Sequence, residues 1–319
     1  MMSLYDTRVD AKTNLLNTTD NLIEKPPAPF LRWAGGKRRL VPVITTLFSK
    51  SFDGKTNKFH EPFVGGGSLM LALGDENSPH FVPGRNLYIS DSNPDLINTY
   101  IVIRDDIDSL IRELRKLSKD VSKESYDSIR LQIPRAPIKR AARLIYLNKT
   151  CFNGIWRVNG SGKFNVPWGK LKNPKIYDES NLRSVSARLK GSKIMHSSFS
   201  SSIKQIGSGD LVYFDPPYIP LSKSASFSSY AKEGFGINEH EMLANLIGGL
   251  EAKGAFVLLS NSDTPATREI FGNSMYLYNL DVSRSISANS SSRKPVKEII
   301  ASNYKIHHTN LHFRLKRIN

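Results

Sequence analysis

Short apolar runs alternate with helical stretches along most of the chain. The runs have the length of buried strands and occupy residues 87–91, 192–195, 211–214 and 255–259. Helices are predicted at residues 37–48, 107–117 and 238–250, the last two from apolar residues that recur every three or four positions. Strands that alternate with helices favour a mostly parallel sheet, so the chain is predicted to be an α/β protein.

The alternation stops between about residue 95 and residue 190, which predicts an inserted domain. Within it, Asn159-Gly160 separates two short runs at 155–158 and 163–166, a strong signal for a β-hairpin. We therefore expect three parts, which are a mobile polar tail at residues 1–29, a sheet domain at residues 30–95 and 179–319, and a second domain at residues 96–178.

The chain is strongly basic, with 45 Lys and Arg against 29 Asp and Glu and a net charge of +16. This charge predicts a polyanionic partner, most simply nucleic acid. Residues 128–177 contain no Asp or Glu, and aromatic residues are interspersed with their cations, as in proteins that combine phosphate contacts with base stacking. The cations of this segment are Arg130, Arg135, Lys139, Arg140, Arg143, Lys149, Arg157, Lys163, Lys170, Lys172 and Lys175.

Cysteine, histidine and apolar content exclude several classes of protein. The single cysteine, Cys151, excludes an internal disulfide framework and a multi-cysteine zinc site. The seven histidines form no metal-ligand motif, so no metal is expected. No apolar run reaches the roughly 18 residues of a transmembrane helix, and the amino terminus lacks an apolar signal core. A cytoplasmic location without membrane contact is therefore expected.

Two glycine-rich turns precede predicted helices. Gly35-Gly36-Lys37 is not a phosphate-binding P-loop, because Leu31 and Arg38 occupy positions that require glycine and Ser or Thr. A bland loop is the alternative there. The second turn, at residues 61–68, follows a strand end, but Met70 stands where a nicotinamide fingerprint requires glycine. Its glycines allow a ligand to approach the backbone closely, and the following helix offers free N–H groups.

Acidic residues end two of the predicted strands. Asp91 follows the strand at 87–91, where such an acid either grips ribose hydroxyls or caps the next helix. After the strand at 211–214 come Asp215-Pro216-Pro217-Tyr218. Their carboxylate and carbonyl oxygens are free to accept hydrogen bonds from an amino group, and the tyrosine ring offers a face for stacking. A simple strand-ending turn is the alternative interpretation.

Taken together and in order, these segments resemble the Dam-type DNA adenine-N6 methyltransferases. The matching stretches are residues 30–37, 61–68, 90–100, 147–169, 215–218, 227–235, 260–270 and 282–299. The resemblance implies a Rossmann-like three-layer α/β/α sheet with an inserted helical and β-hairpin DNA-recognition domain. It also implies S-adenosylmethionine as methyl donor and double-stranded DNA as substrate, often at the sequence GATC.

The resemblance also assigns roles to individual residues. The target adenine would be held by Asp215, Pro216, Pro217 and Tyr218. The cofactor would be bound by Trp33, Lys37, Glu61, Phe63, Gly65, Gly67, Asp91, Phe199 and Asp215. DNA would be contacted by Arg32, Phe152, Asn153, Ile155, Arg157, Pro167, Arg284, Asn289 and Arg293.

Three positions depart from the common family pattern. Ser198 stands where many relatives have an acid, and Ile155 replaces a common leucine. Arg32 stands where a lysine often reads the first guanine, although the arginine fork can also bind guanine bidentately.

Chemistry narrows the reaction further. Methylation of cytosine C5 needs a thiolate, usually after a proline, whereas Cys151 follows Thr150 in the expected recognition domain. Methylation of cytosine N4 is the nearest alternative, because it presents the same amino group. A catalytically silent DNA-binding regulator is an alternative from another class. We expect a monomer, with a separately encoded restriction endonuclease as a further partner.

Overall fold

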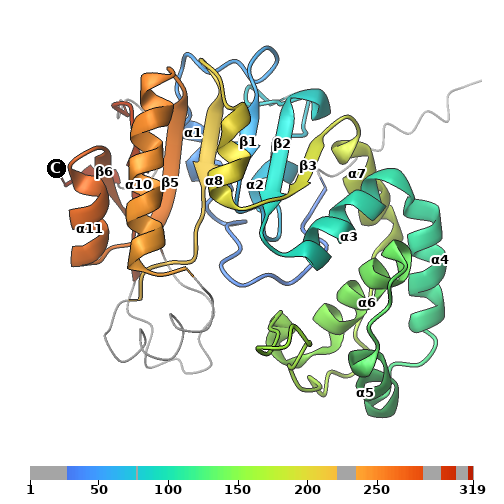
Figure 1. Ribbon diagram of the computed structural model, residues 1–319. Helices are drawn as coiled ribbons and strands as arrows, with labels where there is room; N and C mark the ends of the chain where they lie inside the picture. Colours follow the sequence, from blue (N-terminus) through green and yellow to red (C-terminus); the bar gives the residue numbers. More distant parts are fainter. Residues whose placement is uncertain (1–26, 77, 221–234, 283–295, 307–314, 319) are drawn as a thin grey trace, which may run out of the picture.

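The computed structural model describes residues 27–76, 78–220, 235–282, 296–306 and 315–318. A sheet domain lies beside a mostly helical domain (Figure 1). The described strands form one eight-stranded sheet in the order β3-β2-β1-β4-β5-β7-β6-β8. The neighbours from β3 to β5 are parallel, whereas β7 is antiparallel to β5 and β6, and β8 is antiparallel to β6. The predicted α/β fold is confirmed.

The strand order places β1 and β4 side by side in the middle of the sheet. The strands are β1 (Phe59–Glu61), β2 (Leu87–Asp91), β3 (Lys193–His196), β4 (Leu211–Phe214), β5 (Phe256–Ser262), β6 (Tyr276–Val282), β7 (Val296–Ser302) and β8 (Leu315–Arg317). From β1 the chain adds β2 and β3 on one side and β4 and β5 on the other, so the topological switch point lies between β1 and β4. In open α/β sheets, ligands bind beyond the carboxyl ends of strands at such a point.

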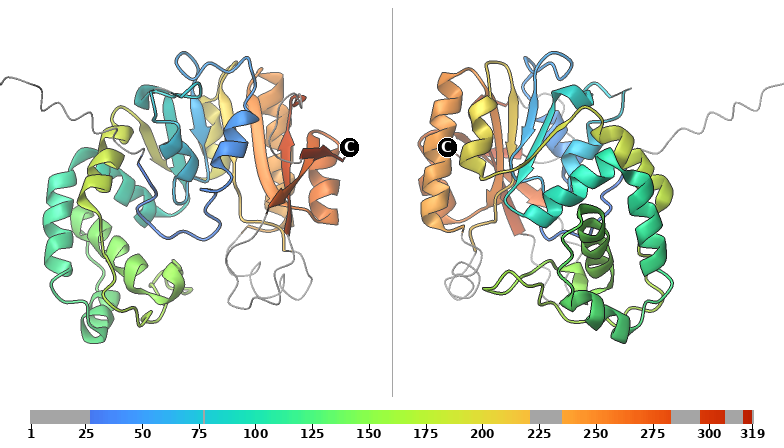
Figure 2. Two further views of the ribbon diagram at one scale, coloured as in Figure 1. Left: turned by 180° about the vertical axis from the view of Figure 1, so that it is seen from behind. Right: turned by 45° about the vertical axis from the view of Figure 1, so that its right-hand side comes forward.

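Helices cover both faces of the sheet (Figure 1, Figure 2). One face carries α8 (Phe199–Ser202), α10 (Ile237–Ala252) and α11 (Pro265–Gly272), whereas α1 (Val41–Thr46) and α2 (Ser68–Ala72) pack on the other. Val212 and Phe214 of β4 pack in the hydrophobic core on the α10 face, and Leu211 and Tyr213 pack in the core on the α1 face. A central parallel strand is buried on both faces, which explains why all four positions of β4 are apolar or aromatic.

Two helices differ in length from the predicted ranges. The helix predicted at 37–48 is shorter, because residues 37–40 form turns in which the Lys37 carbonyl accepts from Leu40 and Val41. α10 extends slightly beyond the predicted 238–250. None of the helices in the described ranges is both long and apolar enough to cross a membrane.

Between β2 and β3 the described chain is helical, apart from one hairpin. The helices are α3 (Pro94–Asp105), α4 (Ile107–Leu117), α5 (Lys123–Leu131), α6 (Pro137–Thr150) and α7 (Glu179–Leu189). A short 3-10 helix, η2 (Phe152–Gly154), precedes the hairpin. Two more, η1 (Gly84–Asn86) and η3 (Ile203–Gln205), lie before β2 and after α8. α3 packs against α6 and α7 and also contacts β2 and β3, so it joins the helical region to the sheet.

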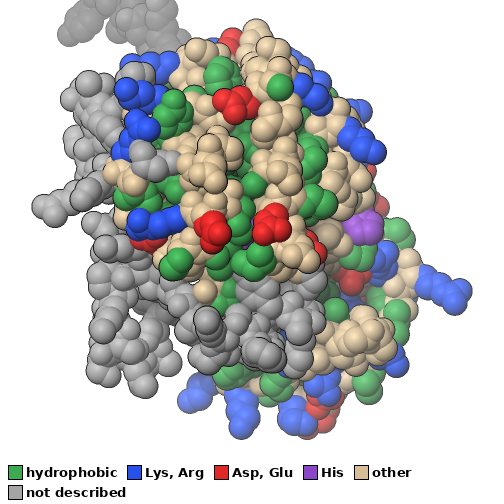
Figure 3. All heavy atoms as spheres, turned by 60° about the vertical axis from the view of Figure 1, so that its left-hand side comes forward, with side chains coloured by type: hydrophobic (Ala, Val, Ile, Leu, Met, Phe, Trp, Pro, Cys, Tyr) green, Lys and Arg blue, Asp and Glu red, His purple; other side chains and the backbone are tan. Residues whose placement is uncertain are grey.

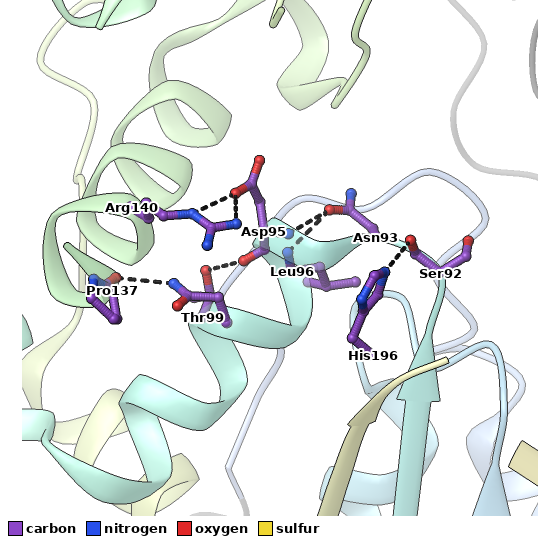
Figure 4. A network of polar contacts seen from close by, with 9 residues as sticks. Ser92, Asn93, Asp95, Leu96, Thr99, Pro137, Arg140 and His196 are labelled. Atoms are coloured by element: carbon purple, nitrogen blue, oxygen red, sulfur yellow. Dashed lines mark hydrogen bonds and ion pairs between the residues drawn. The ribbon is translucent and has the colours of Figure 1, made fainter. Parts of the chain in front are cut away.

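A polar network fixes the first turn of α3 to α6 (Figure 4). The Asn93 side chain caps α3 by accepting from the N–H groups of Asp95 and Leu96. The Asp95 carboxylate then accepts from the Arg140 guanidinium at 2.6 Å. The Asn98 amide donates to the Pro137 carbonyl at 2.9 Å. The first turns of both helices are thereby held together.

The predicted hairpin is present, but its strands pair over only a short length. Val158 and Phe164 form a single antiparallel bridge, and the Asn159 N–H donates to the Lys163 carbonyl at 2.9 Å. The loop therefore spans three residues and ends in Gly162, whose φ of 74° lies in the left-handed region. A three-residue loop with glycine at that position is one of the common hairpin connections.

Two glycines provide a matched test of the packing. A Cβ at Gly84 would lie 1.9 Å from the backbone oxygen of Lys190, which cannot move freely. Gly84→Ala should therefore reduce the free energy of unfolding by about 1–3 kcal/mol. Gly248, in the middle of α10, has open space around it, so Gly248→Ala should increase that free energy by roughly 0.5–1 kcal/mol. Urea titrations of both variants test this, and equal effects would contradict the packing.

Candidate active site

Three predicted segments meet at the carboxyl edge of the sheet. β4 ends at Phe214 and is followed by Asp215, β1 ends at Glu61 and leads into the glycine loop, and β2 ends at Asp91. Because β2, β1 and β4 are parallel neighbours, their carboxyl ends lie side by side. The structure thus brings together segments separated by up to about 150 residues of sequence.

The Asp215 carboxylate forms an ion pair with Lys37. Lys37 Nζ lies 2.9 Å from Asp215 Oδ1, and their side chains are only 9% and 18% exposed. The same ammonium donates to the Gly35 carbonyl at 2.7 Å and lies 4.4 Å from the centre of the Tyr218 ring. Burial raises the pKa of Asp215 above its ordinary value, and the positive charge of Lys37 opposes that rise.

Two residues that the sequence did not single out hold the end of the Asp-Pro-Pro-Tyr segment. The Tyr218 hydroxyl donates to Glu298 Oε2 on β7 at 3.2 Å. Burial raises the pKa of Tyr218 well above its usual range, so the hydroxyl keeps the proton that it donates. Asn261, on β5, accepts from the Ile219 N–H at 3.0 Å. Glu298 lies in the stretch at 282–299 that resembles the family and directly before the apolar run at 299–301, but neither pattern indicates Tyr218 as its partner.

The glycine loop is packed too tightly for side chains. Gly65 and Gly67 have φ values of 46° and 67°, in the left-handed region. A Cβ at Gly65 would lie 2.9 Å from Cδ1 of Trp33, and one at Gly67 would lie 2.7 Å from the Tyr100 hydroxyl. That hydroxyl donates to the Gly65 carbonyl at 2.9 Å. Glycine is therefore required by both backbone conformation and space.

The buried carboxylate of Glu61 is hydrogen-bonded to the backbone of α2. Its Oε2 accepts from the Met70 N–H at 3.2 Å, and the residue is 4% exposed. Burial raises the pKa of Glu61 well above its usual range, and the charge of Asp215 raises it further. The contact ties β1 to the first turn of α2, behind the glycine loop.

Asp91 joins the end of β2 to the glycine loop. Its Oδ2 accepts from the Gly65 N–H at 3.1 Å, and its Oδ1 accepts from the Asn93 N–H at 2.9 Å. The cap of α3 is Asn93, so the alternative of Asp91 as helix cap does not describe the structure. Burial raises the pKa of Asp91, although the backbone donors favour its charged form.

Aromatic rings form a cluster beside this loop. The Phe63 and Phe199 rings are stacked with centroids 5.6 Å apart, and Phe235 contacts them edge-on at 5.4 and 5.5 Å. Ser198, which stands where many relatives have an acid, caps α8 by accepting from the Ser201 N–H. The structure therefore brings together Phe63 and Phe199, two of the three aromatic residues predicted to contact the cofactor.

Several predicted DNA contacts also meet. A Cβ at Gly154 would lie 2.5 Å from the Arg32 Cβ, so Arg32 lies against the turn that contains Phe152 and Asn153. The Phe152 N–H donates to the Pro167 carbonyl at 2.9 Å, which places both sides of the hairpin base together. Phe152 and Ile155 are 51% and 39% exposed. Arg157 lies further out, where its Nε donates to Asn165 Oδ1 at 2.8 Å.

The acid-free segment is only partly a contact surface. Of its aromatic residues, Phe152 is exposed, whereas Tyr146 and Phe164 are buried and Trp156 and Trp168 pack against the core. Of these five rings only Phe152 is exposed enough to stack on a base, because the other four pack in or against the core. Among the cations, Arg140 pairs with Asp95, and Arg143 donates to the carbonyls that end α5. Exposed cations lie at Arg135, Lys139, Arg157, Lys163, Lys170, Lys172 and Lys175, of which Lys175 pairs with Asp178.

Some predicted residues lie outside the described ranges. They are Arg284, Asn289 and Arg293, the tail at 1–26, and the segment at 227–234 that matches the family.

The face covered by α10 and α11 has a different character (Figure 3). Acidic side chains lie among apolar ones in the middle of this view, with Lys and Arg side chains nearer its margin. Exposed acids of these two helices include Glu241, Glu251 and Glu269. These acidic side chains make this face unfavourable for a polyanion.

Comparison with known proteins decides the family. A model of the D12 class N6 adenine-specific DNA methyltransferases matches residues 33–286. The chain belongs to this family. It is 38% identical over 295 residues to the type II methyltransferase M1.LlaDCHI of Lactococcus lactis subsp. cremoris, which covers 89% of this chain and 99% of that protein.

Two further relatives extend the comparison. The type II methyltransferase M.MjaIII of Methanocaldococcus jannaschii is 40% identical over 247 residues, covering 73% of this chain and 84% of that protein. The DNA adenine methylase of Escherichia coli is 33% identical over 276 residues, covering 85% and 94%. This D12 methyltransferase therefore transfers a methyl group to N6 of adenine in DNA, and the alternatives of cytosine N4 methylation and a silent regulator are set aside.

Proposed function

We propose that this enzyme uses S-adenosylmethionine to methylate an adenine that is flipped out of a short double-stranded DNA site, with GATC as the favoured sequence. The observation that carries the proposal is the Asp215 carboxylate, paired with Lys37 at 2.9 Å beside the glycine loop. An amino group can be bound there by oxygen acceptors at the carboxyl end of β4. We also propose that residues 96–178 form the recognition domain, and that the enzyme acts as a monomer.

The residues around the glycine loop suit S-adenosylmethionine. Phe63 and Phe199 offer aromatic surface for its adenine ring, and Asp91 offers a carboxylate for its ribose hydroxyls. Gly65 and Gly67 leave the loop backbone without side chains, and Trp33 lies over it. When bound, the cofactor supplies a methyl group on a positively charged sulfur, which is already strongly electrophilic.

The enzyme's own residues then act on the adenine amino group. The N6 lone pair is delocalised into the ring, so it must be localised before it attacks. The Asp215 carboxylate and the Pro216 carbonyl each accept one N6 hydrogen, which favours a pyramidal nitrogen. Positive charge that develops on N6 is stabilised by the preorganised carboxylate. Tyr218, held by Glu298, presents its ring for stacking on the base.

The proposed recognition domain would deliver the base to this pocket. An adenine inside a duplex cannot reach the end of β4, so the base must leave the stack. Phe152 is exposed at the tip of its turn and can fill the space that the base vacates. Arg32, Asn153, Ile155 and Pro167 lie around the same turn and are proposed to read bases, whereas the exposed lysines contact phosphates.

The Asp215 carboxylate provides the most direct test. Asp215→Asn should reduce the single-turnover rate of methyl transfer by at least about 100-fold, as for other preorganised electrostatic groups. DNA affinity should stay within about threefold, because the carboxylate acts mainly in the transition state. Rapid-quench assays with labelled methyl donor measure the rate, and equilibrium binding provides the control for folding. A near wild-type rate would remove Asp215 from the mechanism.

The ion pair makes the pH dependence testable. Burial raises the pKa of Asp215 and Lys37 counteracts this rise, so Lys37→Met should raise that pKa further. The active form is the carboxylate, and activity is lost as the pH falls through the pKa. The acid limb of the kcat profile should therefore move to higher pH in Lys37→Met. Lys37→Arg, which keeps the charge, should move it less, and an unmoved limb in Lys37→Met speaks against the coupling.

Asp91 and Asn93 separate cofactor binding from helix capping. Asp91→Ala should weaken S-adenosylmethionine binding by about 1.5–3 kcal/mol, as expected for a hydrogen bond to a charged group. Asn93→Ala removes the cap of α3 and should lower stability by about 1 kcal/mol while leaving that affinity nearly intact. Titration calorimetry and thermal unfolding of both variants measure the two effects. Equal losses of affinity would assign Asp91 a purely structural role.

A further inference from the structure

A buried asparagine joins the two parts of the proposed reading surface. Asn148 lies near the carboxyl end of α6 and is 0% exposed. Its Oδ1 accepts from the Arg32 N–H at 2.8 Å, and its Nδ2 donates to the Arg32 carbonyl at 2.7 Å. The second Nδ2 hydrogen is donated to the Gly154 carbonyl at 2.9 Å. One amide thus holds the Arg32 backbone on both sides and fixes it to the Phe152–Gly154 turn.

The same junction is closely packed. Gly154 has a φ of 65°, and a Cβ there would lie 2.5 Å from Cβ and 2.7 Å from Cδ of Arg32. The Arg32 side chain itself is exposed, whereas Phe30 and Leu31 before it are each 5% exposed. The segment is therefore anchored in the core up to Leu31, and the exposed side chain of Arg32 lies against the turn. In Figure 2 this segment runs between the sheet and the helices of the recognition side.

Base recognition depends on such placement. Hydrogen bonds to base edges have a fixed geometry, and reading groups must be held to within about 0.5 Å by the residues that support them. Arg32 and the hairpin come from segments more than 100 residues apart, as their bonds to and from Asn148 show. Without a link between them, each would approach DNA independently.

We propose that Asn148 is a positioning residue for specificity, which holds Arg32 and the Phe152–Gly154 turn in one fixed arrangement against the DNA. The inference rests on the proposed reading of a base by Arg32. Asn148 does not touch DNA, because it is fully buried. It acts through the backbone of Arg32 and through Gly154.

A matched control exists at Ala28, four residues before Arg32. Asn181, on α7, accepts from the Ala28 N–H at 2.8 Å and donates to the Ala28 carbonyl at 2.9 Å. It therefore holds the backbone of the same segment with the same pair of bonds. Among the described residues, the hydrogen bonds that Asn181 makes outside α7 reach only Ala28 and Asp178 and not the hairpin, so its replacement tests the loss of a similar backbone contact without the link to the turn.

The experiment compares Asn148→Asp with Asn181→Asp. Each change keeps the acceptor oxygen but replaces the donating nitrogen by a second oxygen, which repels the carbonyl groups that it faces. Duplexes with each base pair of the preferred site changed singly are assayed with both variants, with Asn148→Ala, with Arg32→Ala and with the double variant. The measured quantity is the ratio of kcat/KM on the preferred duplex to that on each changed duplex. A lower fraction of folded enzyme cancels in this ratio, so general destabilisation does not move it.

We expect Arg32→Ala to reduce this ratio at one base pair, by roughly five- to 100-fold for the loss of a bidentate contact. Asn148→Asp should reduce the ratio at the same base pair, and the double variant should show little further loss. Asn181→Asp should leave every ratio unchanged. Unchanged ratios in both Asn148 variants, alongside a reduced ratio in Arg32→Ala, overturn the inference and leave base reading by Arg32 intact. Unchanged ratios in Arg32→Ala overturn that part of the proposed function, and the inference with it.

Discussion

A carboxylate that little water reaches is the constraint on which the rest of this site depends. An unpaired charge at such a position is costly, and Asp215 is compensated by the Lys37 ammonium at 2.9 Å. Lys37 must itself be held, and the Gly35 carbonyl and the Tyr218 ring both contact its ammonium. Lys37 lies in the turns at residues 37–40, directly before α1.

The glycine loop is held from several directions at once. Asp91 on β2 accepts its Gly65 N–H, Tyr100 on α3 donates to its Gly65 carbonyl, and Trp33 covers it. Glu61 supports the helix that follows. Side chains with locked partners preorganise a binding loop, so little ordering remains to be done when a ligand arrives. The residues with the greatest effect on this loop come from strands and helices far apart in the chain.

Signals carried by a few neighbouring residues predicted the fold and the segments that meet at the candidate site. The apolar run before Asp215 marks β4, and the change of rhythm after β2 marks the helical insertion, because burial on both faces and helical periodicity leave local patterns. The aromatic residues of the acid-free segment misled, since Tyr146 and Phe164 have the same composition signal whether they stack on bases or fill a core. Glu298 and Asn148 were missed, because their partners lie 80 and 116 residues away and sequence spacing does not show such contacts.

One short segment connects recognition with chemistry. Arg32 is held against the hairpin by Asn148, the next residue is the Trp33 that covers the glycine loop, and Lys37 pairs with Asp215. If Arg32 reads a base as proposed, we expect a wrong base that displaces Arg32 to disturb Lys37, five residues later, and with it the ion pair with the Asp215 carboxylate. Because packed segments have discrete arrangements rather than continuous ones, such a displacement affects the reacting groups as well as binding. Discrimination between sites should then be expressed in the rate of methyl transfer and not only in the affinity for DNA, which is the more effective place for specificity in an enzyme.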